Sequence, residues 1–216
     1  MEFQLNRVEL RVLGALLEKD LATPEYYPLS LNALVLACNQ KTNREPVLSL
    51  TEDEVTGALD SLRIKKLCFE NRSSGRVVKF GHNLQSLFNL VRKETAILCV
   101  LMLRGPQTLG ELRSRTGRMA EFTDLAEVEE SLANLSELGL LKMLPRRPGQ
   151  KESRYVQLLS GEPDPAEEPD STAPAAPTAP SPEGDRLSAL EREIKELREE
   201  LIELKKMFSE FKSQFD

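Results

Sequence analysis

The first 160 residues of the chain contain an internal repeat. Apolar residues at helical spacing run from Val55 to Leu67, and the same pattern runs from Val128 to Leu140 at a constant offset of 73 residues. Two upstream groups of apolar residues match at larger offsets, because the first copy has longer connections: Leu31 and Leu34 match Leu109 and Leu112, and Val12, Leu13 and Leu16 match Ile97, Leu98 and Leu101. Two copies of one supersecondary unit are therefore expected in residues 1–160.

Each copy predicts three helices followed by a β-hairpin. N-cap signatures open several of the helices, and these expected N-caps are Asn6, Thr51, Thr108 and Thr123. A shorter helix is expected from Ser30 to Asn39, and the first helix of the second copy is expected near Arg92–Leu103. The hairpins are expected around residues 67–80 and 140–158. This order is the winged-helix pattern, so we predict winged-helix domains at residues 1–82 and 83–160.

The segment at residues 161–184 differs sharply in composition from the repeat. It holds 7 of the 13 prolines and no aliphatic side chain larger than alanine. Such a Pro/Ala-rich segment cannot bury apolar area, so we expect a disordered linker. The predicted fold class is mainly α with small β-hairpins, comprising two tandem winged helices, this linker and a C-terminal coiled-coil helix at residues 185–216.

The coiled-coil prediction rests on an unbroken heptad pattern. The apolar residues are spaced alternately by three and four positions, and they are Leu187, Leu190, Ile194, Leu197, Leu201, Leu204, Phe208, Phe211 and Phe215. A parallel pairing would place three pairs of opposite charge across the seam: Arg186 with Glu191, Glu193 with Arg198, and Glu200 with Lys205. We therefore expect parallel self-association, with the number of chains left open. The alternative, a single helix that folds back on the repeat, usually has a wider apolar face.

The balance of basic and acidic residues also changes after residue 160. Residues 1–160 hold 22 Lys/Arg and 20 Asp/Glu, whereas residues 161–216 hold 7 and 15, so the acidic tail does not exclude an anionic partner for the repeat. No apolar run is long enough for a transmembrane span or signal peptide, and a cytoplasmic protein with no membrane partner is expected. The unpaired spacing of Cys38, Cys68 and Cys99 indicates buried thiols in a reducing compartment, with a reactive thiol as the alternative.

The sequence lacks the common catalytic motifs, so we expect no enzyme, no catalytic residue, no metal site and no cofactor. The single histidine, His82, is expected at the surface or at a strand end. Winged helices commonly bind double-stranded DNA, and basic residues on the expected loops and wings are the candidates for phosphate contacts. These candidates are Lys41, Arg44, Arg72, Arg76, Lys79, Arg113, Arg115, Arg118, Arg146, Arg147, Lys151 and Arg154.

Acidic residues at the start of both expected recognition helices oppose base reading. Glu52-Asp53-Glu54 opens one helix, and Asp124 and Glu127 lie at the start of the other. A DNA-associated or regulatory role is the first hypothesis, and a protein-interaction scaffold that uses the helix faces and the coiled coil is the alternative. Basic loops that are merely solvated remain a third interpretation.

One run of residues resembles a known family. The segment Tyr27-Pro28-Leu29-Ser30-Leu31-Asn32-Ala33-Leu34, followed by Ala37-Cys38-Asn39-Gln40-Lys41-Thr42-Asn43-Arg44-Glu45-Pro46-Val47, is similar to the signature of the YceH-like family of bacterial proteins. The resemblance covers roughly residues 3–158 and implies two winged helices, without implying a reaction. Asn39, Gln40, Asn43 and Arg44 are expected to form a polar loop held by hydrogen bonds to its own backbone, and a ligand site is the alternative.

Overall fold

The structure is a computed structural model that describes residues 4–72, 77–146 and 152–162. All of them belong to one compact unit, Met1–Glu167. The predicted linker and coiled coil lie outside the described residues, except for the first two residues of the linker.

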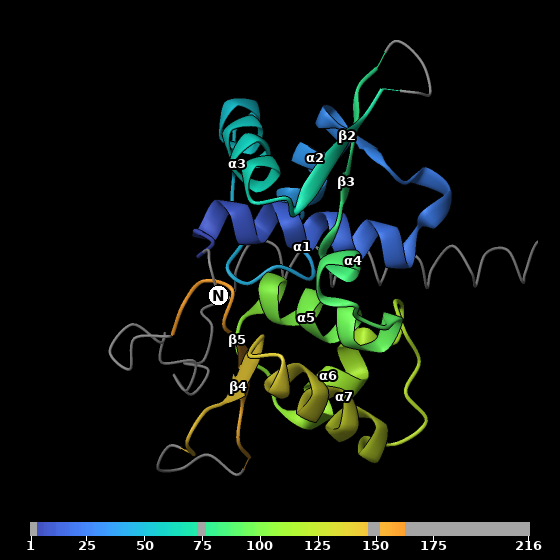
Figure 1. The fold of residues 1–216 in the computed structure, drawn as a ribbon, viewed down its shortest axis with the longest axis vertical. Coiled ribbons are helices and arrows are strands. Elements are labelled where there is room, and N and C mark those ends of the chain that lie inside the picture. The colour runs from blue at the N-terminus through green and yellow to red at the C-terminus, as the bar shows by residue number, and fades with distance from the viewer. Residues whose placement is uncertain (1–3, 73–76, 147–151, 163–216) are drawn as a thin grey trace, which may run out of the picture. The chain divides into compact units, whose positions relative to one another are not determined.

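The described part of the chain is mainly helical, with small antiparallel sheets (Figure 1). The elements of the first half are α1 (Arg7–Ala22), the short 3₁₀ helix η1 (Pro24–Tyr26), β1 (Leu29–Ser30), α2 (Leu31–Cys38), α3 (Glu52–Ile64), β2 (Cys68–Asn71) and β3 (Lys79–His82). After α4 (Leu84–Phe88), the second half contains α5 (Arg92–Arg104), α6 (Leu109–Thr116), α7 (Leu125–Glu137), β4 (Leu141–Met143) and β5 (Tyr155–Gln157). The predicted order of three helices and a hairpin is present in both halves.

Helix starts follow the N-cap signatures, with one correction. Asn6, Thr51 and Thr108 each form a reciprocal capping box with the glutamate three positions later, as predicted. The prediction that Thr123 caps α7 is wrong by one residue, because the side chain of Asp124 accepts from the backbone N–H of Glu127 instead. A carboxylate there also complements the partial positive charge of the helix N-terminus.

Both hairpins form small antiparallel sheets. Strand β3 lies between β2 and β1, with Cys68 opposite His82 and Leu29 opposite Phe80. The second sheet pairs only β4 with β5. The Phe69 ring packs directly over Gly81 in β3, where a Cβ atom would lie 2.4 Å from Cζ of Phe69.

The repeat predicted from the sequence forms a single continuous core. Every residue of the two long apolar patterns is buried: Val55, Leu59, Leu62 and Leu67 in the first half, and Val128, Leu132, Leu135 and Leu140 in the second. The upstream matches also agree, since Leu34 and Leu112 are fully buried while Leu31 and Leu109 are partly buried against the core. The constant offset therefore reflects equivalent positions in two similar packing arrangements.

Helices α1 and α5 join the two halves, with α2 and α3 on one side and α6 and α7 on the other (Figure 1). They approach closely at Gly14, whose missing Cβ would lie 2.9 Å from Cδ2 of Leu103. The thiol of Cys99 donates to the Gly14 carbonyl over 3.4 Å, and Arg92 donates to the Leu21 carbonyl over 2.5 Å. These contacts make the boundary between the halves part of the core.

Candidate functional site

The predicted phosphate-contacting residues do not all lie free on the surface. Arg76, Arg147 and Lys151 are outside the described residues. The side chain of Arg44 is completely buried and bound to Glu18 by two hydrogen bonds of 2.6 and 3.1 Å. Its guanidinium is therefore enclosed by the protein.

Four more of these arginines are engaged within the fold. Arg154 donates to the Pro106 carbonyl and to Glu111, over 2.9 and 3.1 Å. Arg115 lies 3.3 Å from Glu111. The remaining two contacts are between Arg113 and the Thr123 carbonyl (2.9 Å) and between Arg72 and Glu70 (3.0 Å).

The other basic candidates lie on separate elements. Lys41 follows α2, Lys79 belongs to β3 and Arg118 follows α6, and none of the three side chains has a hydrogen bond or ion pair with a described residue. Arg146, which follows β4, does have an interaction. Lys41 and Arg118 line one pocket, which Lys79 does not reach.

The loop after α2 is held by buried and partly buried hydrogen bonds, as the polar-loop hypothesis predicts. The side-chain amide of Asn39 makes two bonds with the backbone of Leu50, over 2.7 and 2.8 Å. Arg44 donates to the Ala37 carbonyl over 2.9 Å, and its contact with Gln40 measures 3.2 Å. Asn43 takes a left-handed backbone conformation, with φ 60°, which asparagine tolerates better than most residues.

A buried arginine on α1 also supports this loop, and the sequence analysis did not single it out. Arg11 donates to the carbonyls of Cys38 and Pro46, over 3.1 and 2.5 Å. Burial and the nearby charge of Arg44 lower the pKa of Arg11. The available signal was its position in the apolar run from Leu10 to Leu17, where a charged side chain requires buried partners.

A pocket lies where this loop meets both halves, and we call it the junction pocket. Its volume is about 660 Å³. Its lining residues come from α1 and the turn that follows it, from the loop after α2, from α5 and from the end of α6: Glu18, Lys19, Ala22, Thr23, Gln40, Lys41, Thr42, Asn43, Cys99, Val100, Leu103, Arg104, Arg115, Arg118 and Met119. The pocket thus combines residues from both copies of the repeat.

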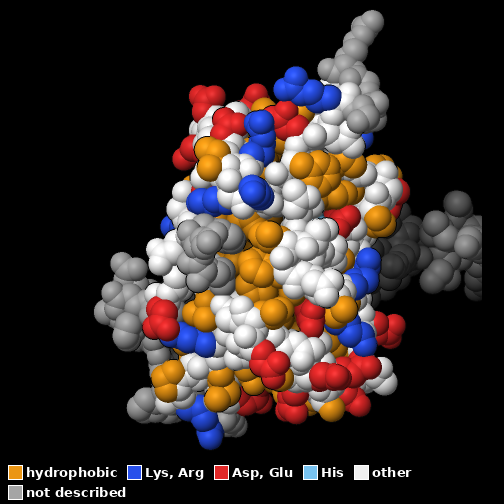
Figure 2. Space-filling view, viewed as in Figure 1, with side chains coloured by type: hydrophobic (Ala, Val, Ile, Leu, Met, Phe, Trp, Pro, Cys, Tyr) orange, Lys and Arg blue, Asp and Glu red, His pale blue; other side chains and the backbone are white. Residues whose placement is uncertain are grey.

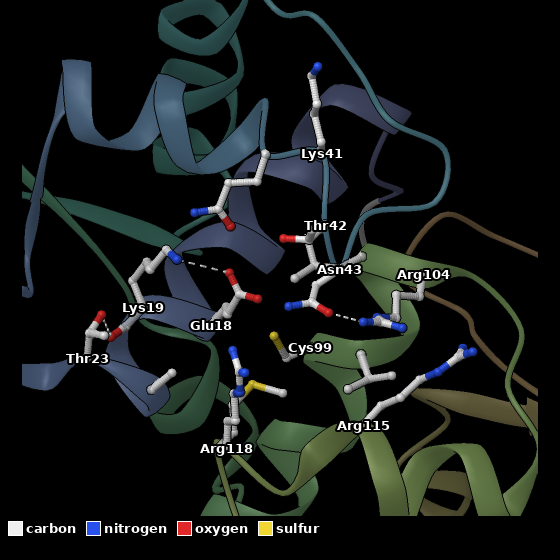
Figure 3. A pocket seen from close by; sticks show the side chains of 15 residues that line it. Glu18, Lys19, Thr23, Lys41, Thr42, Asn43, Cys99, Arg104, Arg115 and Arg118 are labelled. Carbon is white, nitrogen blue, oxygen red and sulfur yellow. Dashed lines mark hydrogen bonds and ion pairs between the residues drawn. The ribbon is translucent and has the colours of Figure 1, made fainter. Parts of the chain in front are cut away.

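The polar groups of the junction pocket are unevenly paired (Figure 3). Lys19 lies 3.4 Å from Glu18, and Arg104 donates to the side-chain oxygen of Asn43. Figure 3 shows Arg118 extending toward Glu18 and Cys99, whereas Lys41 points away from them at the pocket edge. Positive charge therefore faces the pocket without an equal number of carboxylates.

Burial and charge shift the pKa values around this pocket. Burial acts to raise the pKa of Glu18, but the hydrogen bonds and charge of Arg44 outweigh it and lower that pKa overall. Burial, together with the charge of Arg115, lowers the pKa of Arg104. The Glu18 carboxylate is thus neutralised by Arg44, while Arg104 is close to another cation.

The three cysteines are free and buried, as expected. Burial raises the pKa of Cys38 and of Cys68 to about 12, and it raises that of Cys99 further. His82 is at a strand end but is buried, with its Nε2 atom 3.1 Å from the Asp20 carboxylate. Among the described residues, no group of His, Cys, Asp and Glu side chains could hold a metal ion. No helix in the described part of the chain is long and apolar enough to cross a membrane.

The third helices, α3 and α7, expose mainly acidic side chains. On α3 the exposed charged residues are Glu52, Asp53, Glu54, Asp60 and Arg63. On α7 and its N-cap they are Asp124, Glu129, Glu130 and Glu137. Figure 2 shows acidic side chains gathered at both places.

Comparison with known proteins identifies the family. Residues 5–150 match the family described as "Protein of unknown function, DUF480", and the chain belongs to this family. It is 50% identical over 216 residues to a UPF0502 protein of Solibacter usitatus, and the alignment covers both chains completely. It is 52% identical over 219 residues to one of Geobacter sulfurreducens, again with complete coverage of both chains, and 55% identical over 196 residues to one of Citrifermentans bemidjiense, with 90% of each chain covered. These relatives agree with the resemblance to a YceH-like family of bacterial proteins.

Proposed function

We propose that the chain is a non-enzymatic regulatory protein with two tandem winged helices, and that it binds a protein partner with a basic surface through the third helices. The order of three helices and a hairpin in both halves supports the winged-helix assignment. In such a domain the second and third helices form a helix-turn-helix, whose latter helix enters the major groove in DNA-binding proteins. In this chain that position belongs to α3 and α7.

The charge on the third helices is the observation that carries the proposal. Their exposed charged residues are four carboxylates and one arginine on α3, and four carboxylates on α7 and its N-cap. Several of these carboxylates cap or begin a helix, where they stabilise the helix itself. Asp60, Glu129, Glu130 and Glu137 lie beyond the first turn, where helix capping does not account for them. These surfaces would repel DNA phosphates and attract a basic protein.

A nucleic-acid partner is the competing candidate, because basic side chains lie on or beside the hairpins. Arg72 follows β2, Lys79 lies in β3 and Arg146 follows β4. These residues could contact a phosphate backbone without reading bases. The following experiment separates this candidate from the protein partner.

The experiment compares charge-neutral variants of the full chain. Glu129→Gln, Glu130→Gln and Glu137→Gln are combined on α7, and the control combines Glu25→Gln, Glu45→Gln and Glu152→Gln, which remove the same charge from exposed sites elsewhere. Each protein is used to capture partners from nuclease-treated lysate of cells that produce the chain. We expect the wild type and the control to retain the same basic protein, and the α7 variant to lose it.

A gel shift with random duplex DNA provides the second readout. We expect no salt-sensitive complex at about 50 mM salt, where phosphate contacts bind most strongly. The nucleic-acid candidate replaces our proposal if a complex forms, weakens with salt and disappears when Arg146, Arg147 and Lys151 are replaced together. Equal capture by the α7 variant and the wild type would also contradict the proposal.

A further inference from the structure

The junction pocket has a strong excess of positive charge. Five of its lining side chains are cationic: Lys19, Lys41, Arg104, Arg115 and Arg118. Its one carboxylate, Glu18, is already bound by Arg44, which lies outside the lining. Arg115 is paired with Glu111 outside the lining and Lys19 lies 3.4 Å from Glu18, so Lys41, Arg104 and Arg118 have no carboxylate partner among the described residues.

We propose that the junction pocket binds a small organic phosphate. Arg104 and Arg118 supply planar guanidinium groups, which match the geometry of phosphate oxygens and can donate two hydrogen bonds at once. Lys19 adds an ammonium group, and Thr42 adds a hydroxyl at the pocket edge. A bound dianion would offset the repulsion among these cations.

Two of the cations have no competing partner in the described part of the chain. Neither Lys41 nor Arg118 makes a hydrogen bond or ion pair there, and Arg118 extends into the pocket (Figure 3). Arg104 is held by the neutral amide of Asn43 and not by a carboxylate. Burial, and after it the nearby charge of Arg115, lower the pKa of Arg104. A ligand can thus use these groups without breaking a strong ion pair.

The apolar part of the lining indicates an organic ligand. Val100, Leu103 and Met119 line the same pocket as the cations, and Ala22 adds a further apolar side chain. The volume of about 660 Å³ lies within the range of about 300–1,000 Å³ that is typical of small-molecule sites. An inorganic phosphate ion would leave most of this volume and its apolar wall unused.

The ligand would contact both halves of the fold. Lys19 belongs to α1 and Thr42 to the loop after α2, whereas Arg104 belongs to α5 and Arg118 follows α6. Binding to the folded state alone raises the free energy of unfolding, and the rise grows with the logarithm of the ratio of free ligand concentration to Kd. This inference does not depend on a protein partner for the third helices, because it concerns a different surface and is tested with the purified chain alone.

Isothermal titration of the full chain tests the proposal. The probes are AMP and glucose 6-phosphate as organic phosphates, adenosine as a phosphate-free analogue, and inorganic phosphate. We expect at least one organic phosphate to bind with a Kd below about 1 mM, and to bind at least about tenfold more tightly than adenosine or inorganic phosphate. The same probe should raise the melting temperature in a concentration-dependent way.

Arg118→Gln is the decisive variant, because Arg118 is exposed and has no partner that folding requires among the described residues. We expect it to weaken binding about tenfold or more, through the loss of a charged hydrogen-bond donor. Arg72→Gln is the control, since it removes the same charge from the first hairpin, and its Kd should stay within about twofold of the wild type. Thermal denaturation without ligand checks that both variants are folded.

Several results would overturn the inference. One is the absence of saturable binding of either organic phosphate up to about 10 mM. Equal affinity of wild type and Arg118→Gln would show that binding occurs elsewhere. Equal affinity for adenosine and AMP would reject phosphate recognition, and equal affinity for inorganic phosphate would reject the organic ligand.

Discussion

The buried pair of Arg44 and Glu18 should contribute substantially to the stability of the fold. The Arg44 side chain is 0% exposed and that of Glu18 is 12% exposed. Arg44→Met keeps much of the apolar stem but removes every donor, so Glu18 and the Ala37 carbonyl lose the bonds that Arg44 supplies. Removing one partner of a buried pair costs about 3–5 kcal/mol, because the other partner remains desolvated. We expect Arg44→Met to lower the free energy of unfolding by that amount.

A double-mutant cycle isolates the interaction between the two side chains. Glu18→Gln keeps one acceptor oxygen but leaves the Arg44 guanidinium uncompensated and close to Arg11, so we expect a cost of about 1–3 kcal/mol. The double variant removes both charges and should cost at least about 1 kcal/mol less than the sum of the single variants. The more exposed pair of Arg63 and Glu70, at 2.6 Å, is the control, and its coupling should be about 0–1 kcal/mol.

Urea denaturation of the full chain, followed by circular dichroism, measures these free energies at pH 7. Additivity within about 0.5 kcal/mol for Arg44→Met and Glu18→Gln would refute the assigned pairing. The pH dependence gives a second check. The pKa of Glu18 is lower in the folded state than its ordinary value, so its contribution is present at neutral pH and is lost as the pH falls through that lowered pKa. Glu18→Gln should lack this part of the acid destabilisation.

Three further predictions concern packing, thiol reactivity and assembly. Gly14→Ala should destabilise the fold through overpacking against α5. Gly57→Ala is the control: a Cβ atom in the middle of α3 would meet no atom within 4 Å, so this variant should be more stable by about 0.5–1 kcal/mol. A Gly14→Ala variant that is more stable in urea denaturation would contradict the close α1–α5 contact. All three cysteines should react with Ellman's reagent only after denaturation, because burial raises their pKa values and keeps them protonated at pH 8; rapid labelling of the native chain would disprove this. The full chain should sediment as an oligomer and a chain ending at Ser160 as a monomer, and two monomers at about 50 μM would reject the predicted coiled coil.

Periodicity predicted the long elements of the fold well, because their side chains bury one face. The matched positions Leu59 and Leu132, for example, are both buried on the third helices. Elements without such a pattern were missed. Strand β1 has only two residues, Leu29 and Ser30, and is a strand only because it pairs with β3. Helix α4 has five residues, too few to show a helical period.

The candidate site was less predictable, because it depends on long-range contacts. Arg44 and Arg118 were both singled out as basic residues, yet one is buried against Glu18 and the other lines an open pocket. Their local sequences do not distinguish these outcomes. The junction pocket also combines residues near positions 20, 42, 102 and 117, and only the packing of α1 on α5 brings them together. The repeat predicts two similar units but does not predict this packing.

The loop after α2 connects stability of the fold to the shape of the junction pocket. Arg44 fixes the loop through its bond to the Ala37 carbonyl, and the four residues before Arg44, from Gln40 to Asn43, line the pocket. The next residue, Glu45, donates its backbone N–H to the Leu103 carbonyl of α5 over 2.8 Å, so the loop is fixed to both halves. The hydrogen bonds of this loop therefore hold Asn43 against Arg104 across the boundary between the halves. A loop fastened in this way gives the junction pocket a preformed edge, and preformed sites bind ligands with a smaller loss of conformational entropy.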